Sequence, residues 1–488
     1  MAKSDWALRP ASWLAAEIRA GHIGCREALE HYLERIERYN PRFNAVIQLD
    51  AAGARVRADA ADQALARGEI LGPLHGVPMT VKESFDVTGM VTSWGAPEFK
   101  DYRPARSAVC VERLAAAGAN VFGKTNVPYF LGDLQTYNAL YGTTSNPWNP
   151  AHTPGGSSGG AAAALAAGMT ALEVGSDIAS SIRVPAHYCG VYGHKPTYHL
   201  ITPRGQQAPG RQTMPDLAAV GPMARSADDL ALALRVMAGP DRRDAAAWRV
   251  RLLRPGQRRL QDFRVAVLAD TGHAPVDAVI RDRLQHVVEE LRRAGVRVDE
   301  RARPKFETAE ADRLFHRLLD SALSARVPED SYREMQRQAA ALPAGDDDPA
   351  TWVPRDVTLT HREWLIANER RQQMRVLWEE FFQEHDVMLT PVAATVAPTH
   401  HQSGEPFDRM LTVNGVEMPL RRQFFWCGYP ALAHLPATVA PIGTSPDGLP
   451  IGMQIIGPEY GDLTCIQFAR LLARRIGGFQ PPPACANG

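Results

Sequence analysis

The sequence predicts an α/β protein with helices on both faces of a β-sheet. Apolar strand candidates at 76–82 and 119–123 stand on either side of a segment, 107–118, in which Val111 and Leu114 recur at helical spacing. Strands that alternate with helices in this way are typical of an α/β sheet. The 488 residues, 45% hydrophobic and 22% charged, are also sufficient for a large buried core in an ordinary globular protein.

Residues 1–70 are expected to form an N-terminal helical flank of the same domain. Residues 10–40 predict two helices, and Asn40-Pro41 is expected to end the second. A short strand or turn at 43–49 and an Ala-rich helix at 51–67 follow. These elements alone predict no chemistry.

Residues 71–240 are expected to hold the core of the domain. Gly, Thr, Ser, Asn and Pro make up almost all of 142–160, and a long loop in a compact domain is usually functional. Beyond the loop, the pattern predicts a helix at 159–167, a strand at 171–175 and an amphipathic helix at 226–237.

Residues 241–262 are expected to connect the two halves over the surface. Eight arginines fall between Arg242 and Arg264. A solvated connection is the favoured interpretation, and a basic arm for nucleic acid is the alternative. Lys+Arg and Asp+Glu are equal at 54 each, so we expect neither nucleic acid nor an anionic membrane as a partner.

Residues 263–488 are expected to complete the sheet and a pocket. Asn414-Gly415 suits a type I′ turn and predicts a hairpin across 410–418, and 345–354 predicts a loop. The other apolar patterns predict strands at 263–268, 296–298, 387–391, 430–438 and 451–456, and helices at 276–294, 361–385 and 463–475.

No pattern in the sequence indicates a metal, a cofactor or a membrane anchor. The six cysteines are scattered without a CxxC pair, and no HExxH-type spacing occurs. The N-terminus lacks the apolar core of a signal peptide, and no uninterrupted apolar run reaches the roughly 18 residues of a membrane span. We therefore expect a cytoplasmic protein without metal or cofactor.

Two serine clusters, Ser157-Ser158 and Ser180-Ser181, are the candidate nucleophiles. A serine in a Gly-rich loop is usually a turn former or a helix cap. Gly155 to Gly159 matches the letters Gly-x-Ser-x-Gly, but a Pro- and Asn-rich loop precedes it where a nucleophile elbow requires a strand. The nearest histidines, His152 and His187, are expected in a loop or the core.

Lys82 is the best-placed alternative base. Free lysine has a pKa of about 10.4 and is protonated at neutral pH, whereas burial at the end of an apolar strand lowers that pKa. The simpler interpretation is a strand-end lysine that reaches solvent or pairs with Glu83 or Asp86.

Eight motifs, in chain order, resemble those of the amidase signature family of serine hydrolases. The resemblance covers roughly residues 10–475. It implies a single large domain with a twisted mixed β-sheet covered by helices on both faces. The motifs are GVPMTVKE (76–83), GKTNVP (123–128), NPWNP (146–150), GGSSGG (155–160), DIASSIR (177–183), GHKPT (193–197), VGPMAR (220–225) and GLPIGMQ (448–454).

The resemblance implies a Ser-cisSer-Lys catalytic set. It places the nucleophile at Ser181, a bridging serine after a cis peptide bond at Ser157, and the base at Lys82. A neutral, buried lysine can accept a proton from Ser157, which accepts one from Ser181. The same relay run backwards can protonate the leaving amine.

The resemblance also implies the residues around the nucleophile. The oxyanion would be bound by the backbone N–H groups of Ile178, Ala179, Ser180 and Ser181. Ser158, Ser176, Asp177 and Arg183 match supporting positions, although Asp177 and Arg183 could equally form a plain ion pair.

This sequence departs from the family pattern at three places. Ala179-Ser180 stands where Gly-Gly is usual, and a side chain there adds strain if the backbone needs a positive φ. Tyr129 and Glu83 replace the usual glutamate and aspartate, and neither is expected to disable the enzyme. The apolar and aromatic residues expected to line the pocket, with the protein core as the alternative, are Tyr137, Leu140, Tyr141, Phe424, Phe425 and Trp426.

Three functions are weighed on this basis. The first is an amidase, monomeric or homodimeric, that cleaves the C–N acyl bond of a small, apolar or aryl amide through an acyl-serine, with esters or carbamates as further substrates. The second is the glutamine-hydrolysing amidase subunit of a tRNA-dependent amidotransferase. The third is a non-catalytic binding protein on the same fold.

Overall fold

An eight-stranded mixed sheet forms the centre of the protein. The structure is a computed structural model that describes residues 6–343 and 348–486. Strands β10, β9 and β11 run parallel, and every other neighbouring pair is antiparallel. From edge to edge the order is β10 (Arg297–Asp299), β9 (Arg264–Val267), β11 (Val387–Pro391), β15 (Pro450–Ile456), β14 (Ala437–Thr444), β7 (Tyr192–Lys195), β8 (Ala219–Ala224) and β6 (Glu173–Asp177).

A second sheet of three strands lies beside the β6 edge. Its order is β1 (Val46–Leu49), β3 (Asn120–Thr125) and β2 (Pro78–Lys82). β3 pairs antiparallel with β1 and parallel with β2, and β2 packs against β6. The packing of β2 on β6 brings Lys82, at the end of β2, near the residues that end β6.

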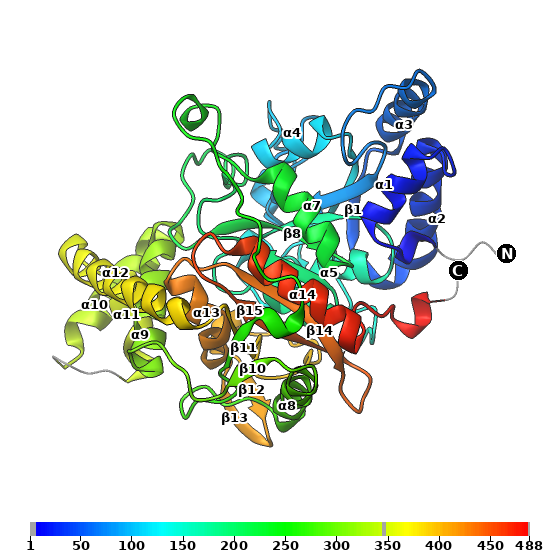
Figure 1. Cartoon of the computed structure of the whole chain (residues 1–488). Helices are drawn as coiled ribbons and strands as arrows, with labels where there is room; N and C mark the ends of the chain where they lie inside the picture. Colours follow the sequence, from blue (N-terminus) through cyan, green and yellow to red (C-terminus); the bar gives the residue numbers. More distant parts are fainter. Residues whose placement is uncertain (1–5, 344–347, 487–488) are drawn as a thin grey trace.

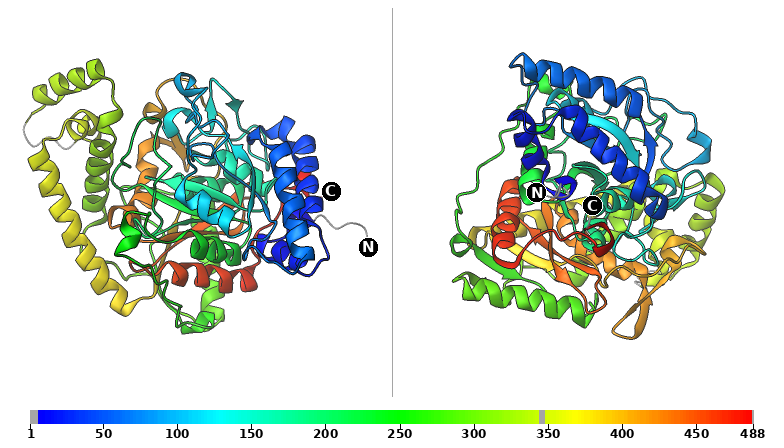
Figure 2. Two further views of the ribbon diagram at one scale, coloured as in Figure 1. Left: turned by 90° about the horizontal axis from the view of Figure 1, so that it is seen from above. Right: turned by 90° about the vertical axis from the view of Figure 1, so that its right-hand side faces the viewer.

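Helices cover both faces of the large sheet, as the sequence predicts (Figures 1 and 2). One layer contains α7 (Ala227–Met237), α14 (Asp462–Ile476) and α8 (Ala278–Arg293), and another contains α5 (Gly159–Ala166) and α6 (Arg183–Cys189). The remaining N-terminal helices, blue to cyan in Figure 1, are α1 (Ala11–Arg19), α2 (Cys25–Phe43), α3 (Ala51–Ala66) and α4 (Val109–Ala116).

A group of helices in the C-terminal half forms an arm beside the sheet. Helix α9 (Thr308–Leu323) packs against α11 (Trp352–Val357), α12 (His361–Glu384) and α13 (Phe424–Leu432), while α10 (Glu329–Ala341) packs on α11. The left view of Figure 2 shows α9 to α12, yellow-green to yellow, on one side of the body. Residues of α9 and α13 line the pocket described below.

Three sequence-based expectations are wrong. Residues 430–432 end helix α13, and β14 begins only at Ala437, because a helix buried on every side has no polar face to reveal its period. Helix α2 continues past Pro41 to Phe43, where Asn44 with φ of 47° ends it. The predicted loop at 345–354 contains the start of helix α11, and its first three residues lie outside the described part of the chain.

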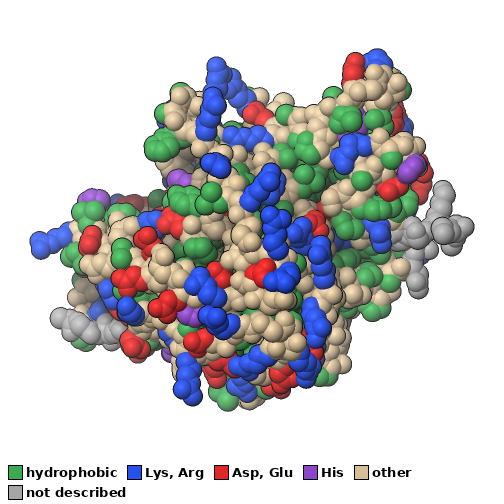
Figure 3. Space-filling view, viewed as in Figure 1, with side chains coloured by type: hydrophobic (Ala, Val, Ile, Leu, Met, Phe, Trp, Pro, Cys, Tyr) green, Lys and Arg blue, Asp and Glu red, His purple; other side chains and the backbone are tan. Residues whose placement is uncertain are grey.

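The hairpin around Asn414-Gly415 has the expected form. β12 (Met410–Val413) and β13 (Val416–Pro419) pair around Asn414-Gly415, both with positive φ. Most of residues 241–262 are exposed, and the segment includes two short 3-10 helices. Lys and Arg side chains gather along the middle of the face in Figure 3. No helix in the described ranges is long and apolar enough to span a membrane. All six cysteines are buried thiols.

Candidate active site

The Gly-rich loop before helix α5 is buried and tightly enclosed. The peptide bond between Gly156 and Ser157 is cis. A Cβ atom at Gly156 would collide with the carbonyl oxygen of Asp133, and one at Gly160 would collide with the backbone of Asn126. Glycine is therefore required at both positions by the close approach of neighbouring backbone, and the loop holds Ser157 in a fixed place.

Lys82 contacts both the Gly-rich loop and the end of β6. Its side chain is fully buried at the end of β2, and Lys82 pairs with Thr125 of β3. The Nζ atom donates hydrogen bonds to Ser157 Oγ at 2.7 Å and to Ser176 Oγ at 3.0 Å. The simpler interpretation of Lys82, a strand-end residue paired with Glu83 or Asp86, is wrong because the side chain points to hydroxyl groups in the interior.

Burial makes Lys82 a base near neutral pH. It lowers the pKa of the Lys82 ammonium to about 7, against the opposing charges of Asp177 and Glu173. Glu173 is itself buried, and burial raises the pKa of its carboxyl group to about 8. At neutral pH, a large fraction of Lys82 is therefore unprotonated and able to accept a proton.

Ser181 and Ser157 line one pocket. Ser181 is 8% exposed, and its carbonyl oxygen accepts a hydrogen bond of 3.1 Å from the N–H of Ser158. Ile178, Ala179 and Ser180, which carry the expected oxyanion-binding N–H groups, line the same pocket. Neither Ala179 nor Ser180 has a positive φ, so their side chains add no strain of that kind.

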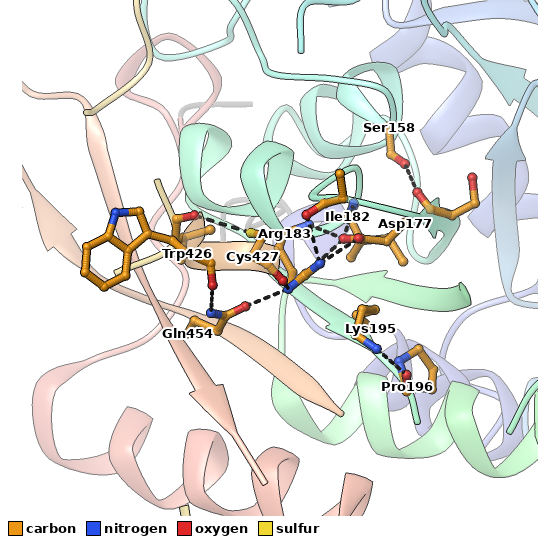
Figure 4. Close-up of polar contacts among 12 residues, drawn as sticks. Ser158, Asp177, Ile182, Arg183, Lys195, Pro196, Trp426, Cys427 and Gln454 are labelled. Atoms are coloured by element: carbon orange, nitrogen blue, oxygen red, sulfur yellow. Dashed lines mark hydrogen bonds and ion pairs between the residues drawn. The ribbon is translucent and has the colours of Figure 1, made fainter. Parts of the chain in front are cut away.

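Asp177 and Arg183 form a buried ion pair beneath this turn (Figure 4). Arg183 Nη2 lies 2.7 Å from Asp177 Oδ1, and Asp177 Oδ2 accepts from the N–H of Ile182 at 3.0 Å. Burial alone would raise the pKa of Asp177, but the charge and hydrogen bonds of Arg183 hold it below its usual value. The pair thus joins the end of β6 to the start of α6 on either side of Ser181.

Arg183 also connects this turn to the C-terminal half. Its Nη1 atom donates to the carbonyl oxygen of Cys427 at 2.6 Å and to Gln454 Oε1 at 2.9 Å. Gln454 in turn donates to the carbonyl oxygen of Trp426 at 2.7 Å (Figure 4). The position of the Ser181 turn therefore depends on residues far away in the sequence.

Ser176 and Gln206 extend the contacts of Lys82. Gln206 Nε2 donates to Ser176 Oγ at 3.0 Å and to Ser84 Oγ at 3.1 Å. Ser158 Oγ makes a long hydrogen bond, 3.5 Å, to the carbonyl oxygen of Ser176. Gln206 lies in the loop after β7, and no motif in the sequence marks it as part of the site.

The pocket above Ser181 has an empty volume of about 860 Å³, part of it open to solvent. Phe424 lines it, whereas the other aromatic and apolar candidates from the sequence do not. Tyr137 accepts a hydrogen bond from Arg409, and Phe425 and Trp426 are buried in the core. The apolar wall is made mainly by Trp94, Leu131, Leu134, Ile178, Met214, Pro215, Leu319, Leu323 and Phe424.

The two histidines and the two variant positions lie outside this contact network. His187 Nδ1 accepts from the N–H of Gly452 at 2.7 Å, and His152 contacts the carbonyl oxygen of Ala397 at 2.7 Å. Tyr129 is 52% exposed and donates to Glu98. Glu83 accepts a hydrogen bond from the N–H of Trp94 at 2.8 Å. None of the four lines the pocket.

The sequence matches those of known proteins along most of its length. A family model described as Amidase matches residues 27–466. Indoleacetamide hydrolase from Bradyrhizobium diazoefficiens is 33% identical over 473 residues, covering 95% of this chain and 86% of that protein. A glutamyl-tRNA(Gln) amidotransferase subunit from Symbiobacterium thermophilum is 33% identical over 470 residues, covering 92% of this chain and 93% of that protein.

Solved structures agree with this relationship. A bacterial aryl acylamidase of the amidase signature family matches with a TM-score of 0.79 and 25% identity over 96% of each chain. The chain belongs to the amidase family and is an enzyme that hydrolyses amides. The predicted family, fold class and enzyme class are confirmed, and the non-catalytic alternative is set aside.

Proposed function

We propose that the protein is a stand-alone amidase that cleaves small, apolar or aryl amides through an acyl-enzyme on Ser181. The observation that carries this proposal is the 2.7 Å hydrogen bond between Lys82 Nζ and Ser157 Oγ, made in the interior beside the pocket that Ser181 lines. It joins a lysine whose pKa is lowered to about 7 to a hydroxyl group that can pass on a proton.

The proposed reaction begins with a proton relay. Neutral Lys82 accepts the proton of Ser157 as Ser157 accepts that of Ser181, and Ser181 Oγ bonds to the carbonyl carbon of the amide. The carbonyl π electrons move to oxygen, where the N–H groups of residues 178–181 stabilise the negative charge. When the intermediate collapses, the C–N bond breaks and the amine leaves with a proton returned by the relay.

Water completes the proposed cycle. It attacks the acyl-enzyme, its proton enters the same relay, and the C–O bond to Ser181 breaks to release the acid and restore the serine. Esters and carbamates share this tetrahedral chemistry and are further candidate substrates. The buried Asp177–Arg183 pair supports the proposal by fixing the turn that carries Ser181.

The pocket lining favours an apolar or aryl substrate over glutamine. Leu131, Leu134, Met214, Leu319 and Phe424 form much of its wall. Glutamine hydrolysis remains the second candidate, because one of the relatives that is 33% identical belongs to a glutamyl-tRNA(Gln) amidotransferase. We propose that the chain acts without such a partner, in the cytoplasm, as a monomer or homodimer. The activity of the purified chain on glutamine, with and without partner proteins of that kind, separates the two candidates.

Labelling with a serine-reactive fluorophosphonate tests the nucleophile. Wild type is expected to be labelled, Ser181→Ala to lose the label, and Ser107→Ala, a control at a surface hydroxyl bonded to Thr88, to keep it. Equal labelling of wild type and Ser181→Ala would refute the assignment. A panel of anilides, aliphatic amides, esters, carbamates and glutamine, compared by kcat/KM, then identifies the substrate class.

A further inference from the structure

One charged side chain of the pocket forms no ion pair with any residue that the structure describes. The pocket is lined by three aspartates and two arginines. The aspartates are all paired: Asp133 with Arg409 at 2.9 Å, Asp177 with Arg183 at 2.7 Å, and Asp320 with the lining residue Arg421 at 2.6 Å. Arg326 is the other lining arginine, and no carboxylate in the described part of the chain forms an ion pair with it. Its Nη1 atom makes a long hydrogen bond, 3.4 Å, to the carbonyl oxygen of Phe130.

Arg326 lies at the mouth of the pocket. Leu319, Leu323 and Arg326 follow one another at helical spacing along α9 and the short 3-10 turn that continues it, and all three line the cavity. Arg326 is exposed, whereas Ser181 is only 8% exposed. Arg326 therefore lies nearer to solvent than Ser181 does, and the apolar side chains of Leu319 and Leu323 line the same cavity.

The guanidinium of Arg326 is held in place by its neighbours. Its Cζ atom lies 5.5 Å from the centroid of the Trp94 ring, within the range of a cation–π contact. Arg211 donates a hydrogen bond of 3.2 Å to the carbonyl oxygen of Ala325 and brings a second positive charge to this rim. The protein atoms around Arg326 and the charge of Arg211 both lower the pKa of Arg326. A negative charge at the mouth would offset this repulsion.

We propose that the pocket takes amides that carry a carboxylate at the end remote from the scissile bond, and that Arg326 binds this carboxylate. The inference rests on the proposed function and narrows its substrate class. A planar guanidinium matches a carboxylate with two parallel hydrogen bonds, and the apolar wall accommodates the body of the substrate between the two ends. Glutamine fits poorly, because its ammonium group would find each lining aspartate already paired with an arginine.

The test compares matched substrates on the purified enzyme. One series consists of acyl 4-nitroanilides whose acyl chain ends in a carboxylate or in an isopropyl group of similar size. A second series consists of acetanilides that carry a para carboxylate or a para methyl group. We expect kcat/KM to favour the carboxylate by about tenfold in at least one series, the scale of a charged hydrogen bond discounted for solvent. High salt is expected to reduce this preference.

Three variants connect the preference to Arg326. Arg326→Gln is expected to abolish the preference through a higher KM for the charged substrate, with the neutral substrate unchanged within about twofold. Arg326→Lys should keep part of it, because it retains the charge without the fork. The control is Arg103→Gln, which removes an exposed arginine that donates to the carbonyl oxygen of Gly89, away from the pocket. Equal kcat/KM for both members of each pair in wild type would overturn the inference, as would an intact preference in Arg326→Gln.

Binding separates this inference from the proposed function. In Ser181→Ala, calorimetry with the same substrate pairs measures recognition without turnover. Tighter binding of the carboxylate, lost on adding Arg326→Gln, supports the inference even if the serine mechanism is wrong. Equal binding of charged and neutral substrates refutes the inference and leaves the proposed amidase activity standing.

Discussion

Two buried lysines, at the ends of two different strands, have similar acidities and different surroundings. Lys82 ends β2 and Lys195 ends β7, and the side chains are at most 1% exposed. Burial is the main cause that lowers the pKa of each to about 7. For Lys195, the positive charge of Arg183 lowers the pKa further.

The difference lies in what each Nζ atom contacts. Lys82 faces the hydroxyl groups of Ser157 and Ser176, whereas Lys195 donates to the carbonyl oxygen of Pro196 at 2.9 Å (Figure 4). A carbonyl oxygen has no proton to give, so Lys195 can be neutral without activating anything. The comparison indicates that a lowered pKa makes a lysine available as a base. It acts as a base only where a neighbouring hydroxyl group can transfer a proton to it.

Replacing each lysine by methionine should show the largest difference between them in catalysis. Lys82→Met is expected to lower kcat by about 1,000-fold, the typical contribution of a positioned general base, while Lys195→Met stays within about tenfold of wild type. Steady-state kinetics on one anilide substrate measures both variants, and thermal unfolding checks that both fold. Similar losses in the two variants would show that burial alone, and not the Ser157 contact, matters.

The pH profile should report Lys82 and not Lys195. Because Lys82 must be unprotonated to act, kcat/KM is expected to rise about tenfold per pH unit below its pKa of about 7 and to level off above it. Activity at pH 5 should thus be about 100-fold below the plateau. Lys195→Met should keep the inflection near pH 7. If the inflection disappeared in Lys195→Met, the titrating group would be Lys195 and not Lys82.

Removing the second hydroxyl contact of Lys82 should have a smaller effect. Ser176→Ala is expected to lower kcat by about tenfold, because it removes one hydrogen-bond partner of the base and leaves Ser157 in place. Ser84→Ala is the matched control: Ser84 accepts from the same Gln206 but makes no hydrogen bond to Lys82. An equal loss of kcat in both variants would mean that Ser176 matters through its contact with Gln206 and not through its contact with Lys82.

The sequence could predict this site where local pattern and chemistry coincide. The sequence shows directly an apolar strand that ends in Lys82 and two serine clusters in Gly-rich surroundings. The ordered motifs then favour catalytic over structural roles for these residues. Gln206 was not predictable, because its contact with Ser176 joins a loop to a strand 30 residues earlier. Arg183 matched a supporting position, but its contacts with Cys427 and Gln454 cross 244 and 271 residues.

The pocket wall was harder to predict than the reacting groups. Helix α9, which supplies Leu319 and Leu323, falls in a segment where no element was predicted. Apolar residues that face a cavity have the same periodicity as those that face the core, so Phe424 and Phe425 could not be told apart from the letters. The reacting groups were therefore easier to predict from the sequence than the shape of the substrate pocket.

Ser180 provides the smallest and sharpest test of the comparison. Its hydroxyl group is buried, lines the pocket beside Ser181 and has no hydrogen-bond partner among the residues that the structure describes. By the reasoning that separates the two lysines, it should be a bystander, since it makes no hydrogen bond to Lys82 or Ser157. Ser180→Ala is expected to change kcat less than threefold, well below the scale of general acid–base catalysis, and to raise the free energy of unfolding by about 1 kcal/mol through removal of an unpaired buried hydroxyl. Kinetics and denaturant unfolding measure the two effects. A tenfold loss of kcat would show that a buried hydroxyl can serve the reaction through the substrate alone, and the rule drawn from Lys82 and Lys195 would then fail.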